Sequence, residues 1–162
     1  MDSVTLRGVM DDDLPLFFEW NRDEDSVQMA AFTSADPSDR AVFDAHWART
    51  RSDPRVVIAT ILHDGQPVGS VLTFPDFGSP EVSYWIDRAH WGKGIASRAL
   101  ALFLKQVDVR PMFGRAASDN VGSIRVLERN GFREIGRETN FADGRGAETE
   151  ETIFVLDGHS TE

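Results

Sequence analysis

The stretch YWIDRAHWGKGIAS, residues 84–97, decides the fold of this chain. Its apolar start is typical of a strand, a short loop with Gly92 and Gly94 follows, and a helical sequence begins at Ile95. At a helix start the main-chain N–H groups lack partners and the helix dipole is positive, which suits a phosphate group. Glycine has no Cβ and lets a diphosphate approach the main chain closely, and Lys93 adds a cation. The stretch therefore predicts a site for a phosphorylated ligand.

Two nucleotide-binding motifs are excluded at this loop. A dinucleotide fingerprint, G-x-G-x-x-G, needs a third glycine where Ser97 stands and belongs to an early βαβ unit, whereas this loop lies past the middle of the chain. A P-loop needs G-x-x-x-x-G-K followed by Ser or Thr, and no such string occurs. A plain glycine-rich turn before a helix remains the alternative interpretation of the loop alone.

A second motif, DNVGSIRVLERNGF at residues 119–132, follows downstream. With it, the sequence resembles the GNAT superfamily of acetyl-CoA-dependent N-acetyltransferases. The family's loop pattern is Gln or Arg, two residues of any kind, Gly, one residue of any kind, and then Gly or Ala. This chain matches the pattern at Gly94 and Ala96 but has Trp91 where Gln or Arg is usual.

The second motif carries the resemblance further. The family has an Asn, a small residue three positions later, and Gly-Phe at the end of the helix. Asn120, Ser123 and the pair Gly131-Phe132 fit this pattern. The two motifs have the order and spacing of the family, and the resemblance covers most of the chain, most weakly before residue 55. The nearest branch contains the ribosomal-protein N-terminal acetyltransferases, with EVSYWI at residues 81–86 leading into the loop.

The resemblance implies an α/β (α+β) fold in one domain, residues 1–162, with a single mixed, mostly antiparallel central sheet and helices on both faces. A chain of 162 residues is typical of one domain. Apolar patterns and turn residues predict strands at residues 4–9, 55–62, 66–74, 81–87, 112–117, 132–139 and 152–156. Helices are predicted to begin near Asp13, at Ser38 or Asp39, after the glycine loop and after Asn120. Residues 21–25 are expected to break the first helical pattern, residues 75–80 and 141–150 to be loops, and residues 157–162 to be a frayed tail.

Composition excludes several classes of site and of protein. The chain has no cysteine, which excludes disulfides, thiolate metal sites and a cysteine nucleophile. No apolar run approaches the roughly 18 residues of a membrane span, and the N-terminus carries no signal region. We therefore expect a cytoplasmic protein that neither enters a membrane nor binds a metal. The histidines are scattered without metal-ligand spacing, at His46, His63, His90 and His159.

The chain is acidic, with a net charge of −10 and a pI near 4.8. This charge argues against binding to nucleic acid or to anionic membranes. It suits a cationic substrate, and a solvated acidic surface explains it equally well. Trp20, Phe32 and the acidic run Asp23–Asp25 lie in the segment that covers the acceptor side in the family. The acidic run either selects a cation there or forms a solvated turn.

The resemblance also implies how the chain holds acetyl-CoA, its co-substrate. The pantetheine arm lies between the strands at residues 81–87 and 112–117 and pairs with main-chain groups like an added strand. The diphosphate lies on the amides of the glycine loop. Asn120 hydrogen-bonds the pantetheine arm, caps the helix that it precedes, or does both. The implied cofactor-binding residues are Trp85, Ile86, Trp91, Gly92, Lys93, Gly94, Ile95, Ala96, Ser97 and Asn120.

Two residues are candidates for the chemistry. Glu81 matches a glutamate that serves as the base in the related branch, and a carboxylate can take the amine proton directly or through water. The alternative for Glu81 is a carboxylate at a strand start that faces water. Ser123 is the candidate acid for the departing thiolate, because the Tyr that many members carry seven residues after the Asn is Leu127 here. The alternative for Ser123 is a small residue that allows close packing against the cofactor.

The sequence thus predicts an N-acetyltransferase that moves an acetyl group directly from acetyl-CoA to a primary amine, on a protein N-terminus or a small molecule. An α-amine has a pKa of about 8, against about 10.4 for lysine, and is therefore easier to deprotonate near neutral pH. The rival hypothesis is an acetyl-CoA-binding sensor or interaction module without turnover, which Trp91 and Leu127 leave open. Protein N-termini, polyamines, aminoglycosides and amino-acid metabolites remain open as acceptors. A monomer and a homodimer both fit the sequence.

Overall fold

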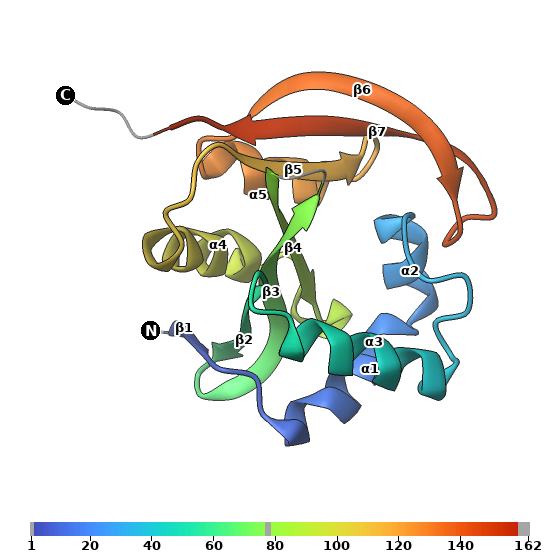
Figure 1. The fold of residues 1–162 in the computed structure, drawn as a ribbon, viewed down its shortest axis with the longest axis vertical. Helices are drawn as coiled ribbons and strands as arrows, with labels where there is room; N and C mark the ends of the chain where they lie inside the picture. The colour runs from blue at the N-terminus through green and yellow to red at the C-terminus, as the bar shows by residue number, and fades with distance from the viewer. Residues whose placement is uncertain (1, 77–78, 159–162) are drawn as a thin grey trace.

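A seven-stranded sheet organises the computed structural model, which describes residues 2–76 and 79–158 (Figure 1). The strands lie side by side in the order β1-β2-β3-β4-β5-β7-β6. Strands β4 and β5 are parallel, and every other neighbouring pair is antiparallel. The strands are β1 (Val4–Arg7), β2 (Val57–His63), β3 (Gln66–Asp76), β4 (Ser79–Ile86), β5 (Met112–Ala117), β6 (Arg133–Ala142) and β7 (Ala147–Leu156).

Helices cover both faces of this sheet. Figure 1 shows α4 on one side of the central strands and α1, α2 and α3 on the other. Side chains of β4 alternate accordingly, because the Tyr84 hydroxyl reaches Ser123 in α5 whereas Trp85 Nε1 donates to the carbonyl of Trp20 in α1. The predicted fold class, a mixed and mostly antiparallel sheet with helices on both faces, is confirmed. The helices are α1 (Leu14–Asn21), α2 (Glu24–Ala30), α3 (Arg40–Ser52), α4 (Ile95–Gln106) and α5 (Val121–Arg129), with short 3-10 turns η1 (Asp11–Asp13) and η2 (Arg88–His90).

Apolar side chains hold the two helical layers to the sheet. Ile95, Leu100 and Phe103 of α4 are fully buried against apolar residues of β3 and β4. Among α1 and α3, Phe17 and Trp47 are buried with ring centroids 5.1 Å apart. Each such side chain contributes about 1.5–3 kcal/mol by leaving water, so both layers are tied firmly to the strands that carry the site.

Local sequence signals start and end the helices where they are predicted. Pro15 lies in the first turn of α1, where its missing N–H costs nothing. Asp39 caps α3 by accepting the N–H of Val42 at 3.1 Å. Gly131 follows the end of α5 at φ +89°, a conformation that favours glycine.

The acidic run at residues 21–25 breaks the first helical pattern as predicted, because α1 ends at Asn21, but a second helix that was not predicted, α2, begins within the run at Glu24. Asp23 accepts the N–H of Ser26 at 3.0 Å and caps this helix. Glu24 and Asp25 lie in its first turn, where negative charge is favourable. The run is therefore a helix start, and a helix of 7 residues is too short to show a clear apolar stripe.

Two predicted loops are largely strand. Strands β3 and β4 pair as far as Asp76 opposite Ser79, so the described part of residues 75–80 is strand. Proline has no N–H to donate to the sheet and is confined to edge strands, strand starts and bulges, which makes it a weak strand signal. Strand β6 ends at Ala142 and strand β7 begins at Ala147. The loop predicted at residues 141–150 is therefore only a turn at residues 143–146. Most side chains of β6 are exposed, so its sequence is polar and lacks apolar alternation.

The predicted terminal tail is described only in part, because residues 159–162, including His159, lie outside the described residues. Asp157 pairs with Arg133 at 2.7 Å. Within residues 2–76 and 79–158, no helix is long and apolar enough to cross a membrane. The same part of the chain holds no group of three or more His, Cys, Asp or Glu that could bind a metal ion.

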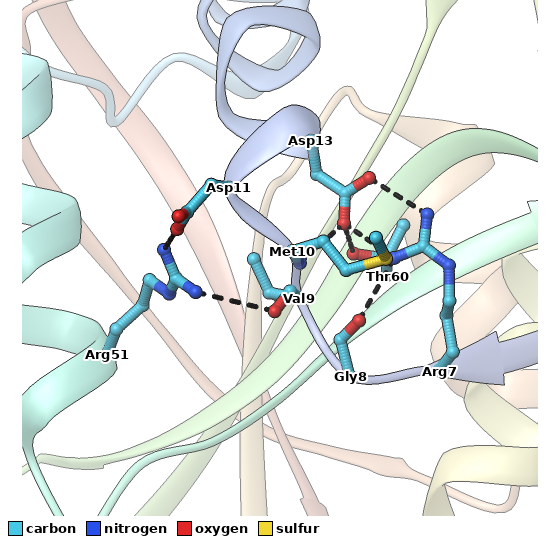
Figure 2. Close-up of polar contacts among 8 residues, drawn as sticks. All are labelled: Arg7, Gly8, Val9, Met10, Asp11, Asp13, Arg51 and Thr60. Atoms are coloured by element: carbon cyan, nitrogen blue, oxygen red, sulfur yellow. Dashed lines mark hydrogen bonds and ion pairs between the residues drawn. The ribbon is translucent and has the colours of Figure 1, made fainter.

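Figure 2 shows a buried carboxylate that anchors α1 to the sheet. Asp13 is only 2% exposed, and its carboxylate accepts two hydrogen bonds from Arg7, at 2.7 and 2.9 Å. It also accepts the Thr60 hydroxyl at 2.8 Å and the Met10 N–H at 2.9 Å. Burial alone would raise the pKa of Asp13, but the hydrogen bonds that it accepts, first of all from Arg7, lower it below its ordinary value. The network ties β1, η1 and β2 together.

The two parallel strands meet over only two residue pairs. Glu81 lies opposite Phe113, and Val82 lies opposite Gly114. Beyond these pairs β4 continues through residues 83–86 without pairing with β5. An unpaired strand edge offers main-chain donors and acceptors to an added strand. This parting of β4 and β5 determines where the candidate site lies.

Candidate active site

The parting of β4 and β5 opens a cleft of about 510 Å³. Residues of α2, β4, the glycine loop, the start of α4 and α5 line it. Every predicted cofactor-binding residue except Lys93 lies on this lining, which brings together Trp85, Ile86, Trp91, Gly92, Gly94, Ile95, Ala96, Ser97 and Asn120. Lys93 is in the loop but is exposed and does not line the cleft.

The glycine loop forms an amide cradle at one end of the cleft. Gly92 and Gly94 lie at φ +77° and +75°, and a Cβ built on either would meet nothing within 4 Å. The first main-chain bond of α4 runs from the Arg98 N–H to the Gly94 carbonyl, at 3.2 Å. The N–H groups of residues 95–97 precede that bond and have no acceptor within the helix. Open space above free amides fits a diphosphate.

Trp91 takes the loop position where the family usually has Gln or Arg. Trp91 is 41% exposed and lines the cleft. Its Nε1 donates to the carbonyl of Ile86 at 3.0 Å, which fixes the ring beside the end of β4. The carbonyl of Ile86 therefore keeps only one lone pair for a ligand. The indole acts as a wall of the cleft and supplies no positive charge.

Asn120 caps α5, which is one of the two roles that the sequence leaves open for it. Its Oδ1 accepts the N–H of Ser123 at 3.2 Å, and its Nδ2 donates to the carbonyl of Met29 at 3.4 Å. Both ends of the amide thus have protein partners, and the second one ties α5 to the end of α2. Arg145, in the β6–β7 turn beside α2 (Figure 1), strengthens this connection by donating to the carbonyl of Gln28 at 2.7 Å.

Ser123 is linked to Tyr84, the single tyrosine of the chain. The Tyr84 hydroxyl lies 2.8 Å from Ser123 Oγ and 3.0 Å from the Ser123 carbonyl oxygen. Burial raises the pKa of Tyr84 well above its ordinary value, and the hydrogen bond with Ser123 only partly offsets this effect. The phenol therefore stays protonated and holds Ser123 in place. Leu127, where many family members have Tyr, is buried in the core.

A second cavity, of about 470 Å³, lies on the other side of the parting. Glu81 lines it, so the structure separates this candidate base from the amide cradle. The two cavities share five lining residues, Ala30, Tyr84, Trp85, Asn120 and Ser123. A group held in one cavity can therefore meet a group held in the other beside Ser123.

Arg115 gathers three carboxylates in the second cavity. Its guanidinium lies 3.3 Å from Glu81, 2.6 Å from Glu138 and 3.0 Å from Glu151. Burial alone would lower the pKa of Arg115, but hydrogen bonds to Glu138 and Glu151 raise it, so the guanidinium stays charged. The Glu81 side chain, which is 13% exposed, lies against this cation. No sequence pattern indicates Arg115 or its partners in β6 and β7, because these residues and Glu81 come from four separate strands.

The acidic run at residues 23–25 does not line the second cavity. Asp23 caps α2 and pairs with Arg88 at 2.8 Å, and this ion pair lowers the pKa of Asp23. Asp25 lies 3.6 Å from the same guanidinium. Of the other residues predicted for the acceptor side, Phe32 lines the cavity, whereas Trp20 supports Trp85 through its carbonyl.

Comparison with known proteins gives a family match over most of the chain. Residues 3–133 match the family model described as an acetyltransferase (GNAT) domain. No curated protein sequence matches the chain. Many solved structures resemble the chain. The three described next are at most 23% identical to it in sequence, so each shows a likeness of fold.

Three of these structures indicate the range. RimJ from Mycobacterium smegmatis, in complex with CoA-disulfide, has 23% identity and a TM-score of 0.78, over 95% of this chain and 81% of that one. RimL, a ribosomal L7/L12 alpha-N-protein acetyltransferase in complex with coenzyme A, has 17% identity and a TM-score of 0.75, over 97% and 96%. Spermidine N-acetyltransferase from Vibrio cholerae, in complex with CoA and spermine, has 18% identity and a TM-score of 0.77, over 94% and 95%.

Proposed function

This chain belongs to the GNAT acetyltransferase domain family, and on that premise we propose that it transfers an acetyl group from acetyl-CoA directly to a primary amine. The parting of β4 and β5 is the observation that carries the proposal. It joins a cleft that has free main-chain amides at one end to a second cavity that is lined by Glu81, the candidate base. We take residues 1–162 as one catalytic domain.

The residues of the cleft fit acetyl-CoA. The loop at residues 92–97 has room and free N–H groups for the diphosphate, and the unpaired edge of β4 at residues 83–86 suits the amides of the pantetheine arm. When bound, acetyl-CoA supplies an activated acetyl thioester. The RimJ, RimL and spermidine acetyltransferase structures, which have the same fold, were each solved with CoA or a CoA disulfide.

The amine enters through the second cavity and meets the acetyl group beside Ser123. Glu81 takes the proton that the amine must lose, either directly or through a water molecule. Its carboxylate lies 3.3 Å from the guanidinium of Arg115, on the wall of the cavity through which the amine enters. The neutral nitrogen then attacks the acetyl carbon, the bond between carbon and sulfur breaks, and the nitrogen releases its second proton to solvent as the amide forms.

The departing sulfur takes a proton from Ser123 or from solvent. The Ser123 hydroxyl is a candidate donor because the Tyr84 hydroxyl, 2.8 Å away, can donate to it and leave its own proton free. A thiol has an ordinary pKa of about 8.5, so a strong acid is not required. Leu127, which has no polar atom in its side chain, takes no part in this step.

The acceptor belongs to one of two classes that the similar structures illustrate. One is the α-amine of a protein, as in the name of RimL, and the other is a polyamine, as in the spermidine acetyltransferase. An α-amine, with its ordinary pKa of about 8, is the easier of the two to deprotonate at neutral pH. Both classes are cationic, which suits an acidic chain.

A turnover assay on a panel of amines tests the proposal. Purified protein is mixed with acetyl-CoA and with peptides bearing free N-termini, polyamines, aminoglycosides or amino acids, and the free CoA thiol is measured with time. We expect thiol release that depends on one class of amine and that appears as N-acetylated product by mass spectrometry. If folded protein binds acetyl-CoA but no amine promotes release, the rival function of an acetyl-CoA sensor, which Trp91 and Leu127 leave open, replaces the proposal.

A further inference from the structure

Two helix ends and a strand meet at the point where the two cavities join. Five residues line both cavities, and two of these come from β4. The other three are Ala30, the last residue of α2, and Asn120 and Ser123 at the start of α5. Helix ends fray readily, so contacts outside the cavities must keep these two in place. Their positions matter because the acetyl group and the amine meet beside them.

Arg145, in the β6–β7 turn, holds both helix ends from outside the cavities. Its Nε donates to the carbonyl of Gln28 in α2 at 2.7 Å. Its two terminal nitrogens donate to the carboxylate of Asp119, the residue before the cap of α5, at 2.7 and 2.8 Å. Such a paired contact fixes orientation as well as distance. The side chain of Arg145 is only 14% exposed and lines neither cavity, so its contacts tie the end of α2 to the start of α5.

The backbone at the end of α2 is strained, which explains why it needs a hold. Ala31, the residue after α2, lies at φ +68° and ψ −56°, and the Phe32 N–H donates back to the Ala30 carbonyl at 2.7 Å. This geometry is a γ-turn with positive φ, which is rare and strained. Strain of this kind persists only where neighbouring groups hold it. The Ala31 carbonyl accepts the Gly144 N–H at 2.8 Å, so the β6–β7 turn supplies a second hold.

The β6–β7 turn also packs its main chain directly against α2. A Cβ built on Gly144 would lie 2.6 Å from the Val27 carbonyl oxygen and 2.7 Å from that of Ala31, so only glycine fits here without a shift. Phe32 follows the strained turn directly and lines the second cavity. The β6–β7 turn therefore fixes one wall of the cavity that the amine enters, together with Ala30 where the cavities join.

We propose that Arg145 is a positioning residue for acetyl transfer, a role that rests on the proposed function. It holds α2 and α5 at the spacing that brings the amine nitrogen to the acetyl carbon. A displacement of about 1 Å in such an arrangement costs up to about 100-fold in rate. The amide cradle belongs to the glycine loop and α4, and no contact within residues 2–76 and 79–158 joins Arg145 to them. Binding of acetyl-CoA should therefore depend little on Arg145.

Kinetics of Arg145→Gln test this role. With the best amine of the panel, the single-turnover rate of CoA release should fall at least about tenfold, while the Kd of acetyl-CoA by calorimetry changes by no more than about threefold. Arg145→Lys keeps a cation but not the planar pair of donors, and it should recover part of the rate. Arg137→Gln is the matched control, because Arg137 pairs with two glutamates of the same hairpin and, among the described residues, has no ion pair or hydrogen bond to α2 or α5. It should leave rate and Kd unchanged.

Asp119→Asn removes the same ion pair from the other side and provides a second route if Arg145→Gln does not fold. Its carboxylate is 69% exposed and lines neither cavity. We expect a smaller loss of rate than in Arg145→Gln, because the bond to the Gln28 carbonyl remains. Residues that act through one contact are not additive, so R145Q/D119N should be no slower than R145Q.

Three results would overturn the role of Arg145. One is a rate for Arg145→Gln equal to that of Arg137→Gln, and another is a loss of acetyl-CoA affinity as large as the loss of rate, which would indicate a general loosening of the cleft. The third is a double variant in which the two losses multiply. Failure of the proposed function looks different, because folded wild-type protein would then release no CoA with any amine, and the role of Arg145 would fall with it.

Discussion

Replacing Gly94 by Asp tests most sharply whether the loop at residues 92–97 holds a diphosphate. Gly94 lines the cleft, and a Cβ built on it meets nothing within 4 Å, so an added carboxylate has open space to occupy. A carboxylate about 4 Å from a phosphate charge is repelled by about 4 kcal/mol at an effective dielectric constant of about 20. Movement of the side chain and salt reduce this energy. We expect acetyl-CoA to bind at least about tenfold more weakly, which is about 1.4 kcal/mol.

Gly94→Ala is the matched control for this variant. Gly94 lies at φ +75°, and an L residue in this left-handed conformation costs about 1–2 kcal/mol. Both variants should therefore lose stability in urea titrations, but only Gly94→Asp adds a charge. Calorimetry with acetyl-CoA on the folded variants, at low and at high salt, separates the two effects. The extra loss in Gly94→Asp should shrink as salt screens the repulsion.

The reasoning fails if the two variants bind acetyl-CoA equally well at low salt. The phosphates would then lie away from the loop, and Gly92 and Gly94 would serve only to turn the chain. A loss in Gly94→Asp that does not respond to salt would indicate a change of loop shape and would also contradict the electrostatic account.

Three further variants test other parts of the account. Glu81→Gln should lower turnover about 100-fold at neutral pH with acetyl-CoA affinity nearly unchanged, and higher pH should recover part of the loss because more amine is already neutral; near-normal turnover would remove Glu81 from the mechanism. Asp13→Asn should lower the free energy of unfolding by about 2 kcal/mol near neutral pH. Because the folded-state pKa of Asp13 is lowered, this contribution is present above the unfolded-state pKa of about 4 and is lost as the pH falls through the folded-state value; a difference between wild type and variant that is constant with pH would contradict the role of the charge. Tyr84→Phe should lower the free energy of unfolding by about 1 kcal/mol. Since burial raises the pKa of Tyr84, the phenol should stay protonated up to about pH 10, and wild-type turnover should show no effect of its ionisation. A fall in wild-type turnover toward this pH that the Tyr84→Phe variant does not show would refute the assignment.

Much of the fold could be predicted from the sequence because its signals are local. The capping residues Asp39 and Asn120, and Gly131 at the end of α5, each act within a few residues of their own position. The residues proposed for the cofactor could be grouped for the same reason, since the glycine loop and the start of α4 are one continuous segment. The last residues of edge strand β6, at 140–142, and the prolines of the β3–β4 hairpin escape prediction because they bury few side chains or offer no N–H.

The acceptor side could not be predicted, because the strand order creates it. Arg115 lies on β5, and its partners Glu81, Glu138 and Glu151 come from β4, β6 and β7, which are neighbours only in the order β4-β5-β7-β6. No spacing within the sequence connects these residues. The same holds for the contact between Tyr84 and Ser123, which lie 39 residues apart. A sequence pattern indicates Glu81 and Ser123 as candidates, but only the folded sheet supplies their partners.

The central claim is that acetyl-CoA binds where β4 and β5 part, and hydrogen exchange followed by mass spectrometry tests it most directly. The free amides of the loop and of the β4 edge should exchange rapidly in the free protein and become protected when a ligand covers them. With saturating acetyl-CoA we predict slower exchange in residues 83–86, 92–97 and 120–129, with unchanged exchange in β1 and β2. Folded protein that shows protection elsewhere, or no protection, at saturating acetyl-CoA would contradict the claim.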